Sequence, residues 1–302
     1  MATRSTNLGP DLRAELIKDG RIEDRIAVED DAELVLYYMG EQRGSIAPCG
    51  CPDRPRGGLP RAASYLAKST PGLVLNTGYW MDDGQGIDGN PRPDATLKNQ
   101  WMVRGLTQLD ADAIHVSFND IYGLSTLPMQ DTNLPLVSAN LRGPGIEPFI
   151  IVEHGDKRIG ITGISDPGHP NIHTPRFERS PPVKAASPII EQLSSSTDTV
   201  ILFVHGAADE AKKLARTGHI NIIIDTNEHR GFEPPFKIGQ AFWVRSHAQG
   251  MRLGELRIGS DHAWALDRKI ELDDSLPDHP ELGRLSEAAS EEIKALEKSL
   301  FK

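Results

Sequence analysis

Two cysteines separated by a single glycine form the most unusual local motif of the chain, Pro48-Cys49-Gly50-Cys51-Pro52. Thiols this close together can share a soft metal ion or form a strained disulfide. They can equally lie buried in a rigid loop. A structural zinc site usually takes four ligands, whereas the chain has only 2 cysteines. The motif therefore leaves a thiol or metal-handling role for Cys49 and Cys51 open and does not by itself predict a zinc site.

Histidine, acidic and amide side chains follow several of the expected β-strands. His205 comes directly after the apolar run 200–204, and His229 lies just beyond the run that ends at Ile224. In α/β proteins, ligands collect at the carboxyl ends of the strands. The other polar or aromatic residues in such positions are Glu41, Asn76, Tyr79, Asn119 and Asp120. Each of them alone is a common turn residue, but together they predict a site at one edge of a sheet.

The elements that position these residues alternate between strand and helix in the first half of the chain. Short β-rich runs occur at residues 34–38, 73–75 and 113–117. Between them, residues 59–68 and 94–109 have the composition and spacing of helices. This alternation predicts βαβ units and a sheet that is covered on both faces.

The second half repeats the theme and adds antiparallel strands. A hairpin is expected where runs 149–152 and 159–162 flank the turn at 154–157. Strands are expected at 200–204 and 220–224 around a helix at 207–215, and antiparallel strands at 241–244 and 252–258. The mixture predicts an α/β fold, a double β-sandwich of mixed sheets flanked by helices.

Three regions are expected along the chain: an N-terminal extension over residues 1–32, one domain over 33–270, and a C-terminal amphipathic helix over 271–302. The last helix would either pack on its own domain or dock onto another protein chain, and the extension is a second possible attachment point. The apolar stripe that predicts the helix consists of Leu282, Leu285, Ala289, Ile293, Leu296 and Leu300.

Composition and charge exclude several classes of protein. The formal net charge of −10 over 302 residues argues against a nucleic-acid partner, because binding to phosphates calls for a basic face. No apolar run reaches the roughly 18 residues of a transmembrane helix. Residues 1–33 contain no apolar segment of the kind found in signal peptides. A cytoplasmic location is expected, or an extracytoplasmic one if a signal has been removed.

The order of the motifs resembles that of 5′-nucleotidase-like metallophosphatases of the calcineurin-like phosphoesterase superfamily, in the branch with a PCGC loop. The resemblance covers about residues 34–260 and implies a double β-sandwich. It also implies a phosphoesterase centre in which two metal ions hold the phosphate and activate a water molecule. The motifs that carry it are Gly44, the PCGC loop at 48–51, Gly57-Gly58-Leu59, Arg61-Ala62, and segments 75–78, 111–116, 157–163, 201–205, 220–224 and 250–256.

Matched residue by residue, the first metal-ligand positions of the family hold different side chains here. Where the family has Asp and His in its first motif, this chain has Glu41 and Arg43. Where the family has the Asp that bridges both ions, it has Tyr79. A neutral phenol cannot replace that carboxylate, and without it two neighbouring cations repel each other strongly.

The later motifs of the family are partly kept. The Gly-Asn-His-Glu box, which supplies a ligand and a catalytic His, reads Ser-Phe-Asn-Asp over residues 117–120. The His after the fifth strand is kept as His205. The closing Gly-His-x-His reads Thr226-Asn227-Glu228-His229 and keeps the last imidazole.

Two functions are therefore expected. The first is a catalytically silent binding or assembly protein, without a cofactor, in which Arg43 binds a phosphate-like anion. The alternative is a phosphoester hydrolase with one divalent manganese, zinc or iron ion at a remodelled site. Its metal ligands would be Glu41, His205, Asn227 and His229, and its catalytic residues would be Asn119 and Asp120. Asp82 or Asp83, close to Tyr79 in sequence, would supply the missing carboxylate.

Overall fold

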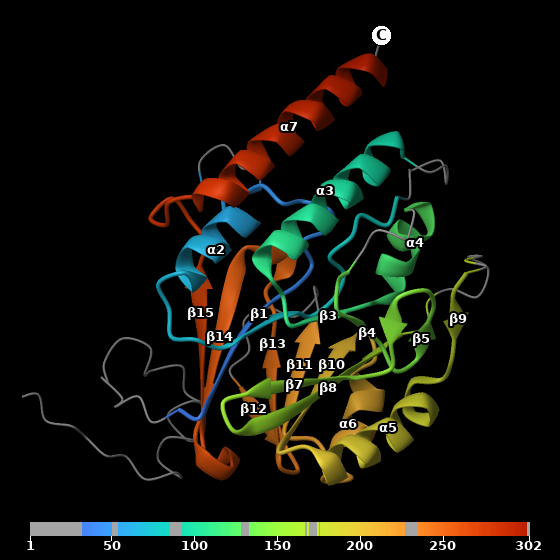
Figure 1. Ribbon diagram of the computed structural model, residues 1–302. Coiled ribbons are helices and arrows are strands. Elements are labelled where there is room, and N and C mark those ends of the chain that lie inside the picture. The colour runs from blue at the N-terminus through green and yellow to red at the C-terminus, as the bar shows by residue number, and fades with distance from the viewer. Residues whose placement is uncertain are drawn as a thin grey trace, which may run out of the picture.

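The computed structural model describes residues 32–49, 54–84, 92–127, 133–166, 168, 174, 176–226 and 235–300. In this part of the chain, two mixed β-sheets pack face to face and helices cover the outer face of each (Figure 1). The double β-sandwich expected from the sequence is confirmed. None of the described helices is both long and apolar enough to cross a membrane.

The first sheet has seven strands in the order β15-β14-β1-β2-β3-β4-β6. Strands β1, β2, β3, β4 and β6 are parallel, whereas β14 is antiparallel to β1 and β15 is antiparallel to β14. The strands are β1 (Leu34–Met39), β2 (Leu73–Asn76), β3 (Ala113–His115), β4 (Leu136–Val137), β6 (Ile146–Glu147), β14 (Arg252–Ile258) and β15 (Ala265–Glu271).

The second sheet has six strands in the order β12-β13-β11-β10-β8-β7, with parallel strands in the centre and antiparallel ones at both edges. A two-stranded sheet of β5 (Leu141–Arg142) and β9 (Glu178–Arg179) lies apart. The six strands are β7 (Ile150–His154), β8 (Lys157–Ser165), β10 (Thr199–His205), β11 (Ile222–Thr226), β12 (Phe236–Ile238) and β13 (Ala241–Arg245).

The two late strands expected at 241–244 and 252–258 lie in different sheets. Strand β13 lies parallel to β11 and antiparallel to β12 in the second sheet. Strand β14 lies in the first sheet, antiparallel to β1 and β15. Between them the chain crosses from one sheet to the other through the short 3-10 helix η2 (Ala248–Gly250).

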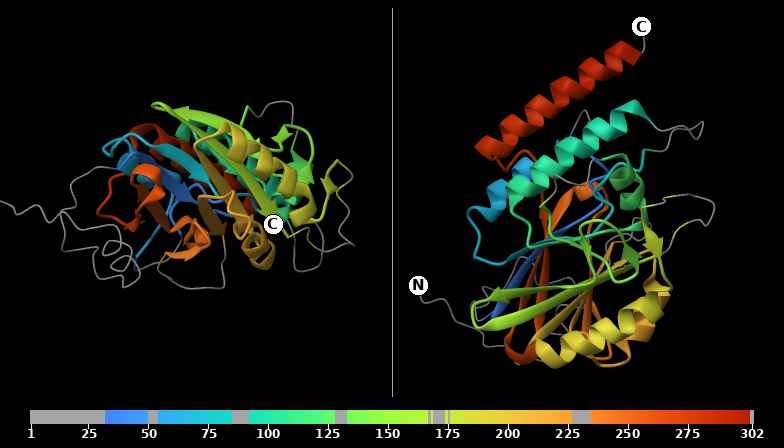
Figure 2. Two further views of the ribbon diagram at one scale, coloured as in Figure 1. Left: turned by 90° about the horizontal axis from the view of Figure 1, so that it is seen from below. Right: turned by 45° about the vertical axis from the view of Figure 1, so that its right-hand side comes forward.

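The helices form the two outer layers of the sandwich (Figures 1 and 2). The first sheet carries α2 (Leu59–Leu66), α3 (Pro93–Leu109) and α7 (Pro280–Leu300), and the second carries α5 (Pro182–Ser196) and α6 (Ala208–Ala215). Helix α4 (Phe118–Thr126) directly follows β3, and the 3-10 helix η3 (Ser260–His262) joins β14 to β15.

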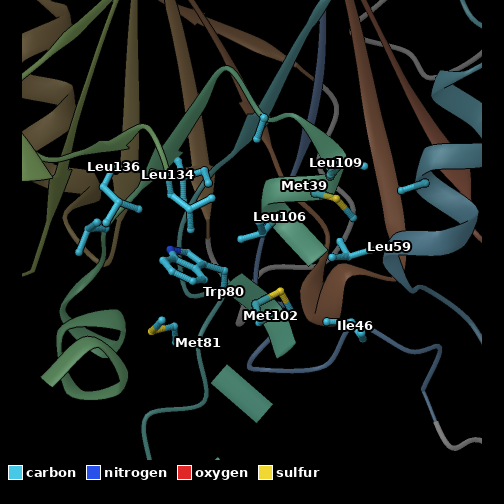
Figure 3. Close-up of a cluster of buried hydrophobic side chains, with 14 of the residues drawn as sticks. Met39, Ile46, Leu59, Trp80, Met81, Met102, Leu106, Leu109, Leu134 and Leu136 are labelled. Carbon is cyan, nitrogen blue, oxygen red and sulfur yellow. The ribbon is translucent and has the colours of Figure 1, made fainter. Parts of the chain in front are cut away.

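Three apolar clusters hold these layers together. One lies between the sheets and contains Leu36, Ile161 and Phe203. A second lies between the second sheet and helices α5 and α6. The third lies under α2, α3 and α7, where Trp80, Met102 and their neighbours pack together (Figure 3). Because both faces of β1 and β10 are covered, these strands read as continuous buried runs.

Helix α7 packs on this domain along the stripe that predicts it. Leu282 and Ala289 are buried, and Leu285 and Ile293 pack against the same cluster as α2 and α3. The first half of the helix is buried most deeply, since Leu282 and Ala289 are 2% and 1% exposed. The N-terminal extension up to residue 31 lies outside the described residues.

Candidate functional site

The loops that follow β1, β2, β3 and β10, together with the end of β11, meet at the carboxyl edge of the two sheets. Backbone hydrogen bonds join the first two loops: the N–H of Glu41 donates to Gly78 O at 3.0 Å and that of Arg43 to Tyr79 O at 3.2 Å. The structure therefore brings together residues that lie far apart in the sequence, as the strand-end argument predicts.

Three of these residues have a left-handed backbone that side chains seldom adopt. The φ angles are 56° at Glu41, 50° at Arg43 and 54° at Tyr79. For a residue other than glycine this conformation costs about 1–2 kcal/mol. Strained backbone of this kind is concentrated at functional sites, where the surrounding structure imposes it.

A continuous contact joins the side chains at this edge. The Arg43 guanidinium lies 3.5 Å from the buried carboxylate of Glu41 and 4.7 Å from the centre of the Tyr79 ring. The Tyr79 ring meets His205 edge-on at 5.6 Å, and the Phe118 ring lies 5.5 Å from the same imidazole. We call Arg43, Tyr79, His205 and Phe118 the aromatic stack.

The electrostatics of the aromatic stack favour neutral rings beside one cation. Burial raises the pKa of the Tyr79 phenol, and Arg43 opposes this effect. Burial lowers the pKa of His205 to about 3, with smaller contributions from His115 and Arg43. At neutral pH the phenol and the imidazole are thus uncharged. The Nδ1 atom of His205 is buried and has no hydrogen-bond partner in the described part of the chain.

Asp120 lies beside the stack and organises the backbone. Its carboxylate accepts hydrogen bonds from the backbone N–H groups of Ser117, Tyr79 and Met81 at 2.8–2.9 Å and from the Ser117 hydroxyl at 2.6 Å. Together, Ser117 and Asp120 form a capping box at the start of α4. Burial raises the pKa of Asp120 to about 6 despite these donors. Asn119 is half-buried in the first turn of the same helix.

His115 is a buried titratable residue that the sequence reasoning did not single out. Its Nδ1 donates to Thr77 O at 3.1 Å, and burial lowers its pKa to about 4. A Cβ at Gly163, on strand β8 of the second sheet, would lie 2.4 Å from the ring. Only glycine fits there, so His115 closely fills the space between the two sheets. A histidine inside an apolar strand was the only signal for it.

A threonine from the second sheet reaches across to the first. The Thr226 hydroxyl lies 2.7 Å from both the carbonyl oxygen and the hydroxyl of Thr77. Within the first sheet, Gly40 lies close to the same threonine, because a Cβ there would lie 2.4 Å from Thr77 Oγ1. The two sheets are therefore in direct contact at this edge. The candidate ligands Asn227 and His229 lie outside the described residues.

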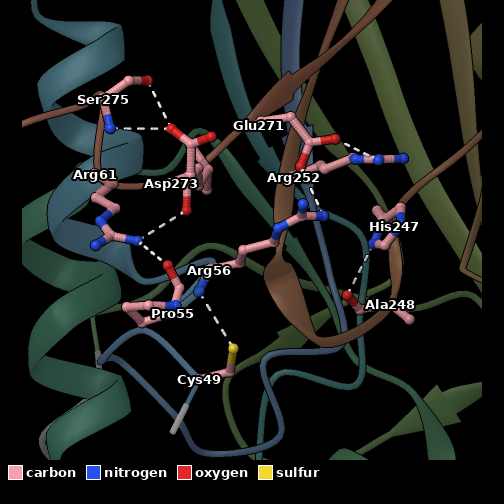
Figure 4. Close-up of polar contacts among 11 residues, drawn as sticks. Cys49, Pro55, Arg56, Arg61, His247, Ala248, Arg252, Glu271, Asp273 and Ser275 are labelled. Atoms are coloured by element: carbon pink, nitrogen blue, oxygen red, sulfur yellow. Dashed lines mark hydrogen bonds and ion pairs between the residues drawn. The ribbon is translucent and has the colours of Figure 1, made fainter. Parts of the chain in front are cut away.

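The described residues on either side of the thiol motif contact one another and helix α2. Cys49 donates its N–H to Arg56 O at 2.7 Å, and the N–H of Arg56 lies 3.2 Å from the Cys49 sulfur (Figure 4). The buried Arg61 of α2 binds the carbonyl oxygens of Pro55 and Leu272. These contacts hold Cys49 beside Arg56 and join Pro55 to α2. Cys51 lies outside the described residues.

The described side chains do not fit a pair of divalent ions. The Glu41 carboxylate already faces a guanidinium, and a phenol and a phenyl ring stand at two positions that the resemblance assigns to metal ligands. A fixed positive charge repels a cation, and aromatic carbon offers it no ligand. Within the described ranges, no group of three or more His, Cys, Asp or Glu side chains is placed to hold a metal ion.

Comparisons with known proteins show the fold. No family model and no curated protein sequence matches this chain. Among solved structures, it is similar to a 5′-nucleotidase precursor from Thermus thermophilus with a TM-score of 0.70 and 17% identity. It is also similar to the Thermus thermophilus sulfate thiohydrolase SoxB (0.68, 15%) and the Haemophilus influenzae NAD nucleotidase NadN (0.68, 14%).

Each of these similarities covers 87% of this chain, but only 59%, 61% and 60% of the three solved chains. The chain thus spans about three fifths of the proteins that it matches. At these levels of identity the comparisons concern the fold alone. The calcineurin-like metallophosphoesterase fold expected from the motifs is confirmed.

Proposed function

We propose that this chain uses a metallophosphoesterase fold for binding or assembly rather than for catalysis, and that Arg43 binds a phosphate-like anion. The observation that supports this most directly is the Arg43 guanidinium, held between the Glu41 carboxylate and the Tyr79 ring at the carboxyl edge of the sheets. A guanidinium carries a permanent charge and a planar set of donors that match phosphate oxygens.

The surroundings of Arg43 support binding more than hydrolysis. Its side chain is 33% exposed, whereas that of Glu41 is 1% exposed, so an anion from solvent can reach the guanidinium but not the carboxylate behind it. The Tyr79 ring and Glu41 fix the orientation of the side chain, which reduces the entropy lost on binding. Hydrolysis by two metal ions would need a shared carboxylate where Tyr79 stands.

Assembly would use the exposed side of α7 and the N-terminal extension. The exposed side of α7 carries charged side chains, among them Glu287, Glu291 and Lys294. Surfaces of this kind suit a polar contact with another protein chain, and the N-terminal extension is a second attachment point.

One observation favours the alternative, a hydrolase with a single divalent ion. The buried Nδ1 of His205 has no hydrogen-bond partner in the described chain, and its imidazole is neutral, as metal binding requires. Glu41 and His205 would then act with Asn227 and His229 as ligands, and Asn119 and Asp120 would act on the substrate. A bound ion would supply a Lewis acid for the phosphate and its attacking water.

Metal content distinguishes the two functions. We would incubate the untagged protein with manganese, zinc and iron, remove free metal, and measure the bound metal by elemental mass spectrometry together with nitrophenyl phosphate hydrolysis. The matched control for His205→Ala is His219→Ala, since His219 is exposed and contacts Ser194 on the surface. We expect no stoichiometric metal and no turnover. About one ion per chain, lost in His205→Ala but kept in His219→Ala, would establish the hydrolase instead.

Anion binding is tested separately by calorimetric titration with inorganic phosphate at low ionic strength. We expect saturable binding to the unmodified protein and at least tenfold weaker binding to Arg43→Gln. Arg216→Gln removes an exposed arginine at the end of α6 and should bind phosphate as the unmodified protein does. Equal phosphate binding by both variants would show that the anion binds elsewhere.

A further inference from the structure

A pocket of about 190 Å³ opens beside Arg43, between the loop that follows β1 and helices α3 and α7. It adjoins the aromatic stack and shares Arg43 with it. Helices α3 and α7 run alongside each other over the first sheet, as the right-hand view in Figure 2 shows. The lining residues used below are Arg43, Ile46, Lys98, Trp101, Ser290 and Ile293.

The walls of the pocket combine apolar surface with positive charge. Ile46 and Ile293 supply aliphatic carbon, and Trp101 supplies an indole. The indole is fixed, because its Nε1 donates to Glu292 at 2.8 Å and the Arg104 guanidinium lies 4.5 Å from its ring centre. A rigid aromatic wall of this kind favours a flat apolar group as its partner.

Two cations and one carboxylate line the pocket. Arg43 contacts Glu41, and Lys98 forms an ion pair with Asp94 one turn earlier on α3. The carboxylate, Asp82, is engaged by Arg92 and by the backbone N–H of Gly84. Each of the three charged groups thus has an oppositely charged partner, and an anion entering the pocket meets the guanidinium of Arg43, whose side chain is 33% exposed.

We propose that this pocket binds the ring of a small aryl phosphate whose phosphate group contacts Arg43. This inference rests on the proposed binding of a phosphate-like anion by Arg43 and names the class of ligand. An apolar cavity of about 150 Å³ accommodates benzene, so the space available here holds one six-membered ring. A nucleoside with a sugar and a two-ring base would exceed it.

The test compares two probes, inorganic phosphate and phenyl phosphate, by calorimetric titration. We expect phenyl phosphate to bind at least tenfold more tightly than phosphate, because only its ring enters the pocket. Ser290→Leu fills the pocket with a larger side chain and should reduce phenyl phosphate to the affinity of phosphate itself. The affinity for inorganic phosphate should stay the same.

A matched control lies on the same helix. Ser290 and Ser299 both donate their hydroxyl to a backbone carbonyl of α7, but Ser299 is exposed outside the pocket. Ser299→Leu should therefore leave both affinities unchanged. As a second measurement, phenyl phosphate should change the tryptophan fluorescence of the unmodified protein in a saturable way but not that of Trp101→Phe. This readout does not depend on whether Ser290→Leu folds.

The outcomes separate this inference from the proposed function. If both probes bind equally tightly through Arg43, the proposed function stands and the pocket assignment is overturned. If phenyl phosphate binds more tightly but Ser290→Leu and Trp101→Phe have no effect, the ring lies elsewhere and the assignment is again overturned. If neither probe binds, anion binding by Arg43 itself fails.

Discussion

Replacing Asp120 with alanine tests whether this carboxylate holds the site together. The buried carboxylate accepts the N–H groups of Ser117, Tyr79 and Met81. In Asp120→Ala these three donors lose their partner, which costs about 1–3 kcal/mol for each buried group, or about 6 kcal/mol in all at the middle of that range. Relief of the buried charge offsets part of this loss.

The size of that offset follows from the pKa of Asp120. The pKa is about 6 in the folded protein, against 3.8 for an ordinary Asp. A raised folded pKa means that the carboxyl stabilises the fold at low pH and that this contribution is lost as the pH rises from about 4 to about 6. Relative to low pH, the raised pKa of Asp120 thus lowers the free energy of unfolding by about 3 kcal/mol at pH 7, and by about 1 kcal/mol less than that at pH 5.

The expected net loss for Asp120→Ala is therefore about 3 kcal/mol at pH 7 and about 4 kcal/mol at pH 5. Urea unfolding at both pH values, followed by circular dichroism, measures it. Asp209→Ala is the control, because Asp209 lies in the first turn of α6 but is 80% exposed, and it should cost less than about 1 kcal/mol. A loss below about 1 kcal/mol for Asp120→Ala would refute the structural role.

Three further predictions concern single positions. Asp110 ends α3 with a φ of 56°, so Asp110→Gly should raise the free energy of unfolding by about 1 kcal/mol. An unchanged melting temperature would contradict the left-handed backbone at this residue. The pKa of His115 is lowered to about 4 in the folded protein. The fold is therefore most stable above pH 6.5 and loses stability as the pH falls towards 4. The difference in free energy of unfolding between the unmodified protein and His115→Gln should shrink by about 2 kcal/mol from pH 7 to pH 5. Thr226→Val removes the hydroxyl that contacts Thr77 and should cost about 1–2 kcal/mol in urea unfolding; an unchanged midpoint would contradict that contact.

Much of the fold could be predicted because burial leaves a pattern in the sequence. The run at β10 is apolar almost throughout, and Thr199–His205 is buried along its whole length. Pairing partners leave no such pattern, since β13 and β14 are both short strands of mixed composition but lie in different sheets. Helix α4 was also missed. Its capping box at Ser117 and Asp120 was in the sequence, but this segment was interpreted only as a catalytic motif.

The site could be predicted in position more than in detail. The carboxyl ends of the strands do bring Glu41, Tyr79 and His205 to one edge. Arg43 and Tyr79, which contact each other, both have a left-handed backbone, and no spacing rule indicates such a conformation for Arg or Tyr. His115 was missed because in the sequence it is one residue of an apolar strand. Only its neighbours in the other sheet show how closely the ring is packed.

The order of strands in the first sheet has a consequence for the synthesis of the protein. Strand β1 is the first described strand to leave the ribosome, but its antiparallel neighbour β14 begins only at Arg252. The second sheet is complete at Arg245. Until the last strands emerge, β1 has an open, apolar edge of the kind that pairs with other chains. Released chains truncated after residue 245 should therefore bind chaperones more than released chains truncated after residue 271, which chaperone pull-down would measure.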